Sequence, residues 1–356
     1  MPLTCGLVGL PNAGKSTLFR ALTAARAEIA PYPFTTIAPN VGVAPVPDRR
    51  LEAIAAITRP QRVVPATLEV VDIAGLVRNA HKGEGLGNEF LGRIREVDAL
   101  VHVVRCFGGD VAHVEGSVDP VRDIGIVETE LLLADLAAVQ RAREQTAPRA
   151  RSGDQEARER DAALARLEDH LGSGRPARSL PSGPAGATLL TARPVLYVAN
   201  LSEEDTAASP CLDCVRAQAA AEGAIALGIC AKLEMELTEL PASEADEFRS
   251  SLGIQEPGVV RLLQACQSLL NLRTFFSIAS DEVRAWPVPA GTRAPQAAGR
   301  IHTDMERGFI RAETVGFADL VACGSLAAAR ERGLMRLEGK DYEVQDGDVI
   351  TFRFAV

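Results

Sequence analysis

The segment Gly9-Leu-Pro-Asn-Ala-Gly-Lys15-Ser16 decides the fold prediction for this chain. It follows the apolar run Leu3–Val8, which is typical of a buried strand, and it precedes the helical stretch Ser16–Ala25. A G-x-x-x-x-G-K-S spacing between a strand and a helix indicates a phosphate-binding P-loop. Its glycines let backbone N–H groups turn inward at a helix N-terminus, where the partial positive charge favours an anion.

The P-loop motif predicts a role for each residue from 12 to 17. We expect Asn12, Ala13, Gly14 and Thr17 to surround the phosphates together with Lys15 and Ser16. Lys15 supplies a positive charge to the β- and γ-phosphates and is predicted to act in catalysis, and the Ser16 hydroxyl is placed to bind Mg²⁺.

A second motif, Asp72-Ile-Ala-Gly75, ends the next apolar strand, Ala66–Ile73. One strand downstream of a P-loop, the Asp72 carboxylate can hold Mg²⁺ and the Gly75 amide can contact the γ-phosphate. Thr35 and Thr36 lie in a proline-bounded loop before that strand, where a threonine can close on the metal. We choose Thr36 as the third metal ligand; a turn threonine without metal is the alternative.

Leu76 follows Gly75, where Ras-like GTPases carry a glutamine that orients the attacking water. Leucine cannot hydrogen-bond water, so another residue must do this. His113 and His81 are the candidates, and a solvated loop position is the alternative for each. The glycine-rich segment Lys82–Gly87 is expected to act as a mobile switch.

The base-reading segment departs from the N-K-x-D motif of GTPases. Asn200-Leu201-Ser-Glu203 has leucine in place of the lysine that covers the base, and a glutamate in place of the aspartate that reads guanine. Adenine has no 2-amine, so a site without that aspartate loses its discrimination against ATP. Cys230, Ala231 and Lys232 occupy the second base loop, and a solvated acidic loop is the alternative for Glu203.

Short apolar runs alternate with helical stretches up to about residue 272, as expected for a mainly parallel α/β sheet. Helical periodicity within residues 123–190 predicts a helical hairpin inserted between two strands. Residues 273–356 contain short β-type runs separated by turn signals, with a helix expected over Phe317–Arg332. We predict two domains: 1–272 with its inserted hairpin, and a small β-grasp domain at 273–356.

The composition restricts the partners. The chain has 356 residues and a net charge of −9, which opposes nucleic-acid binding by bulk charge. Two segments are locally basic: residues 141–151, with four arginines and one acid, and residues 284–336, with eight arginines and five acids. Each segment can contact RNA or form a solvated surface. Trp286 and Phe309 can stack on RNA bases or pack in the core of the domain.

The seven cysteines are scattered and mostly apolar in context, and no apolar run is long enough to span a bilayer. The sequence predicts a cytoplasmic, monomeric protein with no membrane contact.

These motifs resemble the Obg-like ATPase family of YchF type, within the translation-factor class of P-loop proteins. The resemblance covers essentially the whole chain. It rests on the P-loop and base-loop segments and on three others: Pro33-Phe-Thr-Thr36, Gly83-Glu-Gly-Leu-Gly-Asn88 and Gly308-Phe-Ile-Arg-Ala-Glu313. Cys230 is a departure, because a serine is common there.

The resemblance implies a G domain that prefers ATP, a helical hairpin insertion, a C-terminal TGS domain with the β-grasp fold, ribosome association and slow hydrolysis. By matching position it implies nucleotide contacts from residues 12–17 and from Asn200, Leu201 and Glu203, with Mg²⁺ on Ser16 and Thr36. His113 matches a loop histidine proposed to replace the missing glutamine.

We therefore expect an ATP-hydrolysing switch that requires Mg²⁺ and binds ribosomes, with the basic segments as the candidate contacts to RNA. Two alternatives stay open: a GTPase with relaxed base choice, and a ribosome- or RNA-binding factor that senses ATP without useful turnover.

Overall fold

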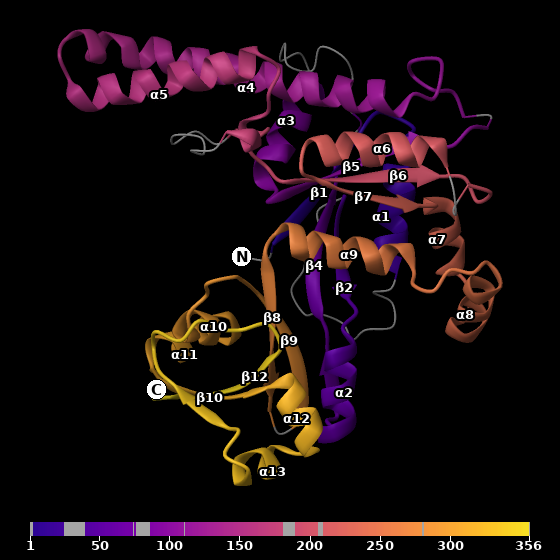
Figure 1. Cartoon of the computed structure of the whole chain (residues 1–356), viewed down its shortest axis with the longest axis vertical. Coiled ribbons are helices and arrows are strands. Elements are labelled where there is room, and N and C mark those ends of the chain that lie inside the picture. Colours follow the sequence, from indigo (N-terminus) through magenta and orange to yellow (C-terminus); the bar gives the residue numbers. More distant parts are fainter. Residues whose placement is uncertain are drawn as a thin grey trace. The chain divides into compact units, whose positions relative to one another are not determined.

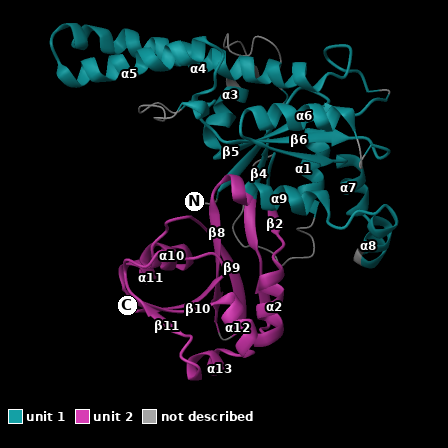
Figure 2. Ribbon diagram, viewed as in Figure 1, with its two compact units in different colours: residues 1–25, 32–43, 69–266 teal, residues 26–31, 44–68, 267–356 magenta. Residues whose placement is uncertain are grey.

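The computed structural model describes residues 3–24, 40–73, 75, 86–109, 111–180, 189–205, 209–279 and 281–355. The chain forms two compact units, which are described separately below (Figure 2). Unit 1 comprises residues 1–25, 32–43 and 69–266, and unit 2 comprises residues 26–31, 44–68 and 267–356. Among the described residues, no helix is both long and apolar enough to cross a membrane.

The first sheet has the strand order β2-β4-β1-β5-β6-β7. Its strands are β1 (Thr4–Val8), β2 (Val41–Val46), β4 (Ala66–Asp72), β5 (Ala99–Cys106), β6 (Val195–Leu201) and β7 (Ile225–Ile229). The pairs β1–β4, β1–β5, β5–β6 and β6–β7 are parallel. Every residue of β5 and β6 is buried, as expected for central parallel strands covered on both faces. The predicted mainly parallel α/β sheet is confirmed.

Helices follow the strands of this sheet along the chain (Figure 1). They are α1 (Lys15–Ala24), α3 (Leu86–Glu96), α4 (Pro120–Arg151), α5 (Gln155–Gly172), the short η3 (Ala177–Ser179), α6 (Pro210–Ala221), α7 (Ala231–Leu237), α8 (Ala242–Ser251) and α9 (Gly258–Leu269).

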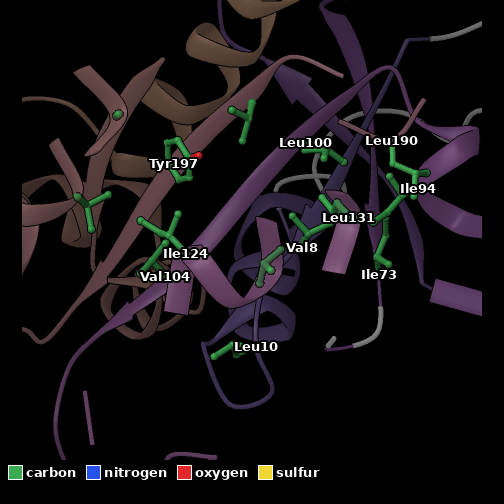
Figure 3. Close-up of a cluster of buried hydrophobic side chains, with 14 of the residues drawn as sticks. Val8, Leu10, Ile73, Ile94, Leu100, Val104, Ile124, Leu131, Leu190 and Tyr197 are labelled. Atoms are coloured by element: carbon green, nitrogen blue, oxygen red, sulfur yellow. The ribbon is translucent and has the colours of Figure 1, made fainter. Parts of the chain in front are cut away.

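Apolar side chains from several of these elements meet in one buried cluster (Figure 3). Val8 from β1, Leu100 and Val104 from β5, Ile94 from α3 and Leu131 from α4 are each at most 2% exposed. Burying such a side chain contributes about 1.5 to 3 kcal/mol. The cluster fixes the strand ends from which the functional loops emerge.

The predicted helical hairpin is present between β5 and β6. Helices α4 and α5 pack along each other and extend away from the sheet (Figure 1). Asp119 caps α4 and Asp154 caps α5, each through a hydrogen bond to a first-turn N–H. A second apolar cluster, including Val139, Leu164 and Leu167, joins the two helices.

Unit 2 contains a six-stranded sheet of order β11-β10-β12-β8-β9-β3. Its strands are β3 (Arg62–Val64), β8 (Leu272–Ile278), β9 (Glu282–Pro289), β10 (Phe309–Gly316), β11 (Arg336–Glu338) and β12 (Asp348–Phe354). Its helices are α2 (Arg49–Thr58), α10 (Ala294–Ile301), α11 (Thr303–Arg307), α12 (Phe317–Cys323) and α13 (Leu326–Glu331). The β8–β9 hairpin is antiparallel, and β12 pairs parallel with β8. Helix α10 follows the hairpin and packs on its apolar face, which is the arrangement of a β-grasp.

Unit 2 differs from the predicted C-terminal domain because it also includes residues 44–68. Strand β3 pairs parallel with β9, and Arg50 of α2 forms an ion pair of 2.6 Å with Asp346. These pairings join residues that are far apart in the sequence, and no local motif indicates them. For this reason the sequence predicted that residues 44–68 belong to the first domain.

The helix expected over Phe317–Arg332 is two helices. It breaks at Gly324, whose φ of 72° ends α12 in the left-handed region that glycine adopts easily.

Candidate nucleotide-binding site

The described loops at the carboxyl ends of β1, β5, β6 and β7 line one pocket of unit 1. Ligands of open parallel sheets bind at this edge, because the loops after parallel strands meet there. The pocket has a volume of about 980 Å³. It is lined by Asn12, Gly14, Lys15, Ser16, Thr17, Phe107, Gly108, Gly109, Val111, Asn200, Leu201, Ser202, Glu203, Glu204, Cys230, Ala231 and Lys232. Eleven of these residues are among the twelve predicted nucleotide contacts; the twelfth, Ala13, is 2% exposed and does not line the pocket.

The glycines of the P-loop are required by its backbone. Gly14 has φ of 91°, and a Cβ atom there would lie 2.1 Å from the Asn200 side-chain nitrogen. A Cβ on Gly9 would lie 2.3 Å from the Val103 carbonyl oxygen. Neither position accepts a side chain, so glycine allows the loop backbone to pack closely against β5 and Asn200.

Lys15 is the first residue of α1 and is only 7% exposed. Its ammonium group donates to the carbonyl oxygens of Gly9 (3.1 Å) and Leu10 (2.9 Å). Burial lowers the Lys15 pKa to about 8, although Asp72 opposes this shift. The lysine is therefore held in the loop as a positive charge with few neutralising partners.

Ser16 and Asp72 meet although 56 residues separate them. The Ser16 hydroxyl donates to Asp72 Oδ2 at 2.7 Å. A hydroxyl and a carboxylate placed together match the oxygen donors that Mg²⁺ prefers beside substrate phosphates. The Gly75 backbone is near the same loop, because a Cβ there would lie 3.0 Å from Pro11.

Asn200 joins the two halves of the pocket. Its side-chain amide donates to the Ala13 carbonyl of the P-loop (2.9 Å), and its Oδ1 accepts from the Ala231 N–H (3.0 Å). All three residues are at most 4% exposed. The same side chain therefore fixes the phosphate loop against the base loop at the start of α7.

Leu201 and Glu203 of the base loop lie in different environments. Leu201 is 3% exposed and belongs to the apolar core cluster. Glu203 accepts from the Lys232 ammonium at 2.8 Å, and both side chains are well exposed. Glu203 is therefore an exposed, ion-paired residue at the pocket, and the alternative of a solvated acidic loop stays open.

Cys230 caps helix α7, where its sulfur accepts from the Leu233 N–H at 3.5 Å. Burial raises the pKa of its thiol, which keeps it neutral. A serine hydroxyl would make the same cap, so the cysteine preserves the local structure.

The sequence predictions placed His113 in the loop after β5 but did not include the first residues of that loop in the pocket. Phe107, Gly108, Gly109 and Val111 line the pocket. Buried Arg105 holds this loop: it donates to the carbonyl oxygens of Phe107 (3.1 Å) and Val111 (2.7 Å) and lies 4.5 Å from the Phe107 ring centroid. The sequence signal that could have indicated this part of the pocket is an aromatic residue followed by two glycines directly after a parallel strand.

His113 does not line the pocket. Its Nε2 lies 2.7 Å from Asp123 Oδ2, and its Nδ1 accepts from the Glu115 N–H at 3.0 Å. The Nδ1 contact identifies the Nε2–H tautomer, which donates to Asp123. Because both ring nitrogens have partners, contact with an attacking water requires at least one of these bonds to open.

Several predicted residues lie outside the described part of the chain. They are Thr35, Thr36, Leu76, His81 and the glycine-rich residues 82–85.

Two family models match the chain. One, described as a 50S ribosome-binding GTPase, matches residues 4–158. The other, the YchF-GTPase C-terminal family, described as a protein of unknown function, matches residues 272–355.

Similar proteins extend over the full length. The ribosome-binding ATPase YchF of Escherichia coli O157:H7 is 49% identical over 363 residues, with complete coverage of both chains. The protein of the same name from Bacillus subtilis (strain 168) is 48% identical, again with complete coverage of both. The structure of the Schizosaccharomyces pombe YchF GTPase has a TM-score of 0.88 at 34% identity, covering 99% of this chain and 97% of that chain. This chain therefore belongs to the YchF family of P-loop proteins.

Proposed function

We propose that this protein binds ATP with Mg²⁺, hydrolyses it to ADP and phosphate, and couples the nucleotide state to ribosome binding. The observation that carries the proposal is the single pocket in which the P-loop and the altered base loop are joined through Asn200. Its volume is at the upper end of the range of about 300–1,000 Å³ that is typical for small-molecule sites.

The phosphate end of the pocket supplies the electrostatic stabilisation. In our proposal, Lys15 exchanges its two carbonyl partners for β- and γ-phosphate oxygens, and the α1 N-terminus adds backbone N–H groups. The γ-phosphate would hold Gly75 and Thr36 until hydrolysis releases them. Water attacks the γ-phosphorus in line, and the bond from that phosphorus to the bridging oxygen breaks, leaving ADP and phosphate.

Ser16, Asp72 and Thr36 are the proposed Mg²⁺ ligands. When bound, the metal would neutralise charge on the phosphate oxygens. In the structure, Ser16 and Asp72 already hold each other in place, so both oxygens are oriented before a ligand arrives.

The base end favours ATP in our proposal because, among the described residues, no aspartate lines the pocket to pair with the guanine N–H groups. Glu203 stands at that position, and its carboxylate is engaged by Lys232. The GTPase with relaxed base choice is a second candidate, since the S. pombe relative is named a GTPase.

The ribosome as partner is supported by the names of the relatives, which are called ribosome-binding ATPases. We propose that this chain also binds ribosomes. We further propose that it acts in the cytoplasm, where ribosomes work, and that it is a monomer. The C-terminal β-grasp unit is proposed to be a TGS domain.

Hydrolysis is tested by single-turnover assays with labelled ATP, with and without 50S ribosomal subunits. We expect product in both cases and faster product formation with subunits. Lys15→Ala should abolish ATP binding and product, while Lys340→Ala, which removes an exposed lysine of unit 2, should behave as the unmodified protein. Absence of product in both conditions would contradict hydrolysis and favour the nucleotide sensor.

A further inference from the structure

Arg105 is a buried arginine at the carboxyl end of β5, beside the nucleotide pocket. Its side chain is part of a residue that is only 3% exposed. Its Nε donates to the carbonyl oxygen of Phe107 at 3.1 Å, its Nη2 to that of Val111 at 2.7 Å, and its Nη1 to that of Ala112 at 3.4 Å. One guanidinium group therefore contacts both ends of residues 107–112, which we call the β5 loop.

The described part of the β5 loop has little else to fix its conformation. No hydrogen bond joins backbone to backbone among residues 107–109, 111 and 112, which are the described residues of this loop. A Cβ atom on Gly108 or Gly109 would meet no atom within 4 Å, and Val111 is 54% exposed. Glycines without close packing leave a backbone free to change conformation. The conformation of the loop therefore depends on side-chain contacts, and Arg105 supplies three of them.

The β5 loop contacts the P-loop at both of its ends. The Ala112 carbonyl accepts from the Asn12 side-chain amide at 3.2 Å as well as from the guanidinium group. At the other end, a Cβ atom on Gly14 would lie 3.9 Å from the Phe107 ring. His113, the proposed water-orienting group, directly follows Ala112 in the chain. A shift of the β5 loop would therefore move a wall of the pocket and the attachment of His113 together.

The partners of Arg105 suit a guanidinium group better than another cation. The three carbonyl oxygens lie around its plane, and its central carbon lies 4.5 Å from the centroid of the Phe107 ring. A guanidinium group presents five N–H donors in fixed directions and stacks on aromatic rings. A lysine has the same charge, but all its donors are on one nitrogen, so it cannot reproduce this set of contacts.

We propose that Arg105 is a positioning residue for ATP hydrolysis, which holds the β5 loop in the conformation that ATP binding and His113 require. Arg105 does not line the pocket, so it acts through the loop residues that it contacts. This inference rests on the proposed function and deepens it by adding a residue on which the reaction depends.

The test compares two substitutions of Arg105 in the full-length protein. Arg105→Lys keeps the charge, and Arg105→Gln keeps one amide donor group without the charge. Each should raise the Kd for ATP about tenfold in calorimetric titrations, and each should lower the single-turnover rate of hydrolysis by a similar factor, because a displacement of about 1 Å can have effects of this size. Thermal unfolding of the same samples reports whether each variant is folded.

Arg193→Lys is the matched control. Arg193 also donates to a backbone carbonyl, that of Arg95 at 3.0 Å, but it precedes β6 and so lies at the amino end of the parallel strands, away from the pocket. This variant should keep both the Kd and the single-turnover rate of the unmodified protein.

A double-mutant cycle with Phe107→Leu separates positioning from a general effect on stability. If Arg105 acts through Phe107, the effect of Arg105→Lys on the Kd should be smaller when Phe107→Leu is already present, because contacting residues are not independent. Equal fold-changes in the two backgrounds would overturn the inference.

Three other results would also contradict a positioning role. Full ATP affinity of Arg105→Lys together with a loss in Arg105→Gln would show that only the charge matters. Loss of the cooperative unfolding transition in both variants would make Arg105 a residue required for folding. If the unmodified protein binds and hydrolyses ATP and both variants match it, the inference fails and the proposed function stands, whereas no ATP binding by the unmodified protein contradicts the proposed function itself.

Discussion

Lys15 is a cation held in a position that disfavours its charge. Burial lowers its pKa to about 8 in the folded chain, compared with about 10.4 in an unfolded chain. Between these values the unfolded chain binds more protons, so the stability of the nucleotide-free protein rises with pH across this window. Charged Lys15 therefore reduces stability below pH 8, and a bound phosphate would relieve that cost.

ATP affinity should consequently fall at alkaline pH. If ATP binds the charged lysine, its Kd should rise about tenfold from pH 7 to pH 9, because the charged fraction falls through the pKa. Calorimetric titrations at each pH measure this change. Lys15→Arg is the matched control, since its guanidinium does not titrate and any residual affinity should be independent of pH. A wild-type Kd that is equal at the two pH values would contradict the assignment.

The sequence predicts a catalytic role for His113, but its contacts in the structure do not place it in the pocket. Its sequence position suggests a substitute for the missing glutamine, whereas in the structure it is bound to Asp123 and Glu115. We retain it as the proposed water-orienting group, reached after one of these bonds opens.

His113→Ala should lower kcat at least about tenfold while leaving the Kd for ATP nearly unchanged, because the side chain does not line the pocket. Asp123→Asn removes the charge opposite Nε2 and also weakens the Arg122 contact to Asp123 Oδ1, and it should have a smaller effect on kcat. Full activity of His113→Ala in single-turnover assays would remove this histidine from the mechanism.

At the scale of elements, the pocket depends on loops that meet only because their strands are parallel neighbours. The P-loop after β1 and the segments after β6 and β7 are joined by Asn200 across 187 and 31 residues of sequence. The loop after β5 is tied to the P-loop as well, because Asn12 donates to the Ala112 carbonyl at 3.2 Å.

Asn200→Ala should weaken both ATP binding and folding stability. It leaves the buried Ala13 carbonyl and Ala231 N–H without a partner, which costs about 1 to 3 kcal/mol for an unsatisfied group. Thermal unfolding and ATP titration measure the two effects. Ser202→Ala is the control: Ser202 also lines the pocket, but its hydroxyl donates to Asp205 in its own loop. If the two variants behave alike, Asn200 does not join the loops.

The sequence predicted the elements that carry a local signal. The P-loop, the parallel sheet and the inserted hairpin have motifs or periodicity within a single segment. The pairing of β3 with β9 and the Arg50–Asp346 contact join distant segments and have no such signal. For the same reason the sequence did not predict that Phe107, Gly108, Gly109 and Val111 line the pocket, because this depends on which strands become neighbours.

At the scale of the whole molecule, net charge was a poor guide to the distribution of charge. The basic segment 141–151 loses most of its excess in the fold. Arg143 pairs with Glu168 and Asp161, and Arg149 pairs with Asp154.

The identity of the nucleotide is the central claim of this account. It depends on the absence of a guanine-reading aspartate and on the engagement of Glu203 by Lys232. The most direct test is to measure the dissociation constants of ATP and GTP for the full-length protein in the presence of Mg²⁺. We predict that ATP binds at least about tenfold tighter than GTP, a difference of about 1.4 kcal/mol. GTP binding equal to or tighter than ATP binding would contradict the account.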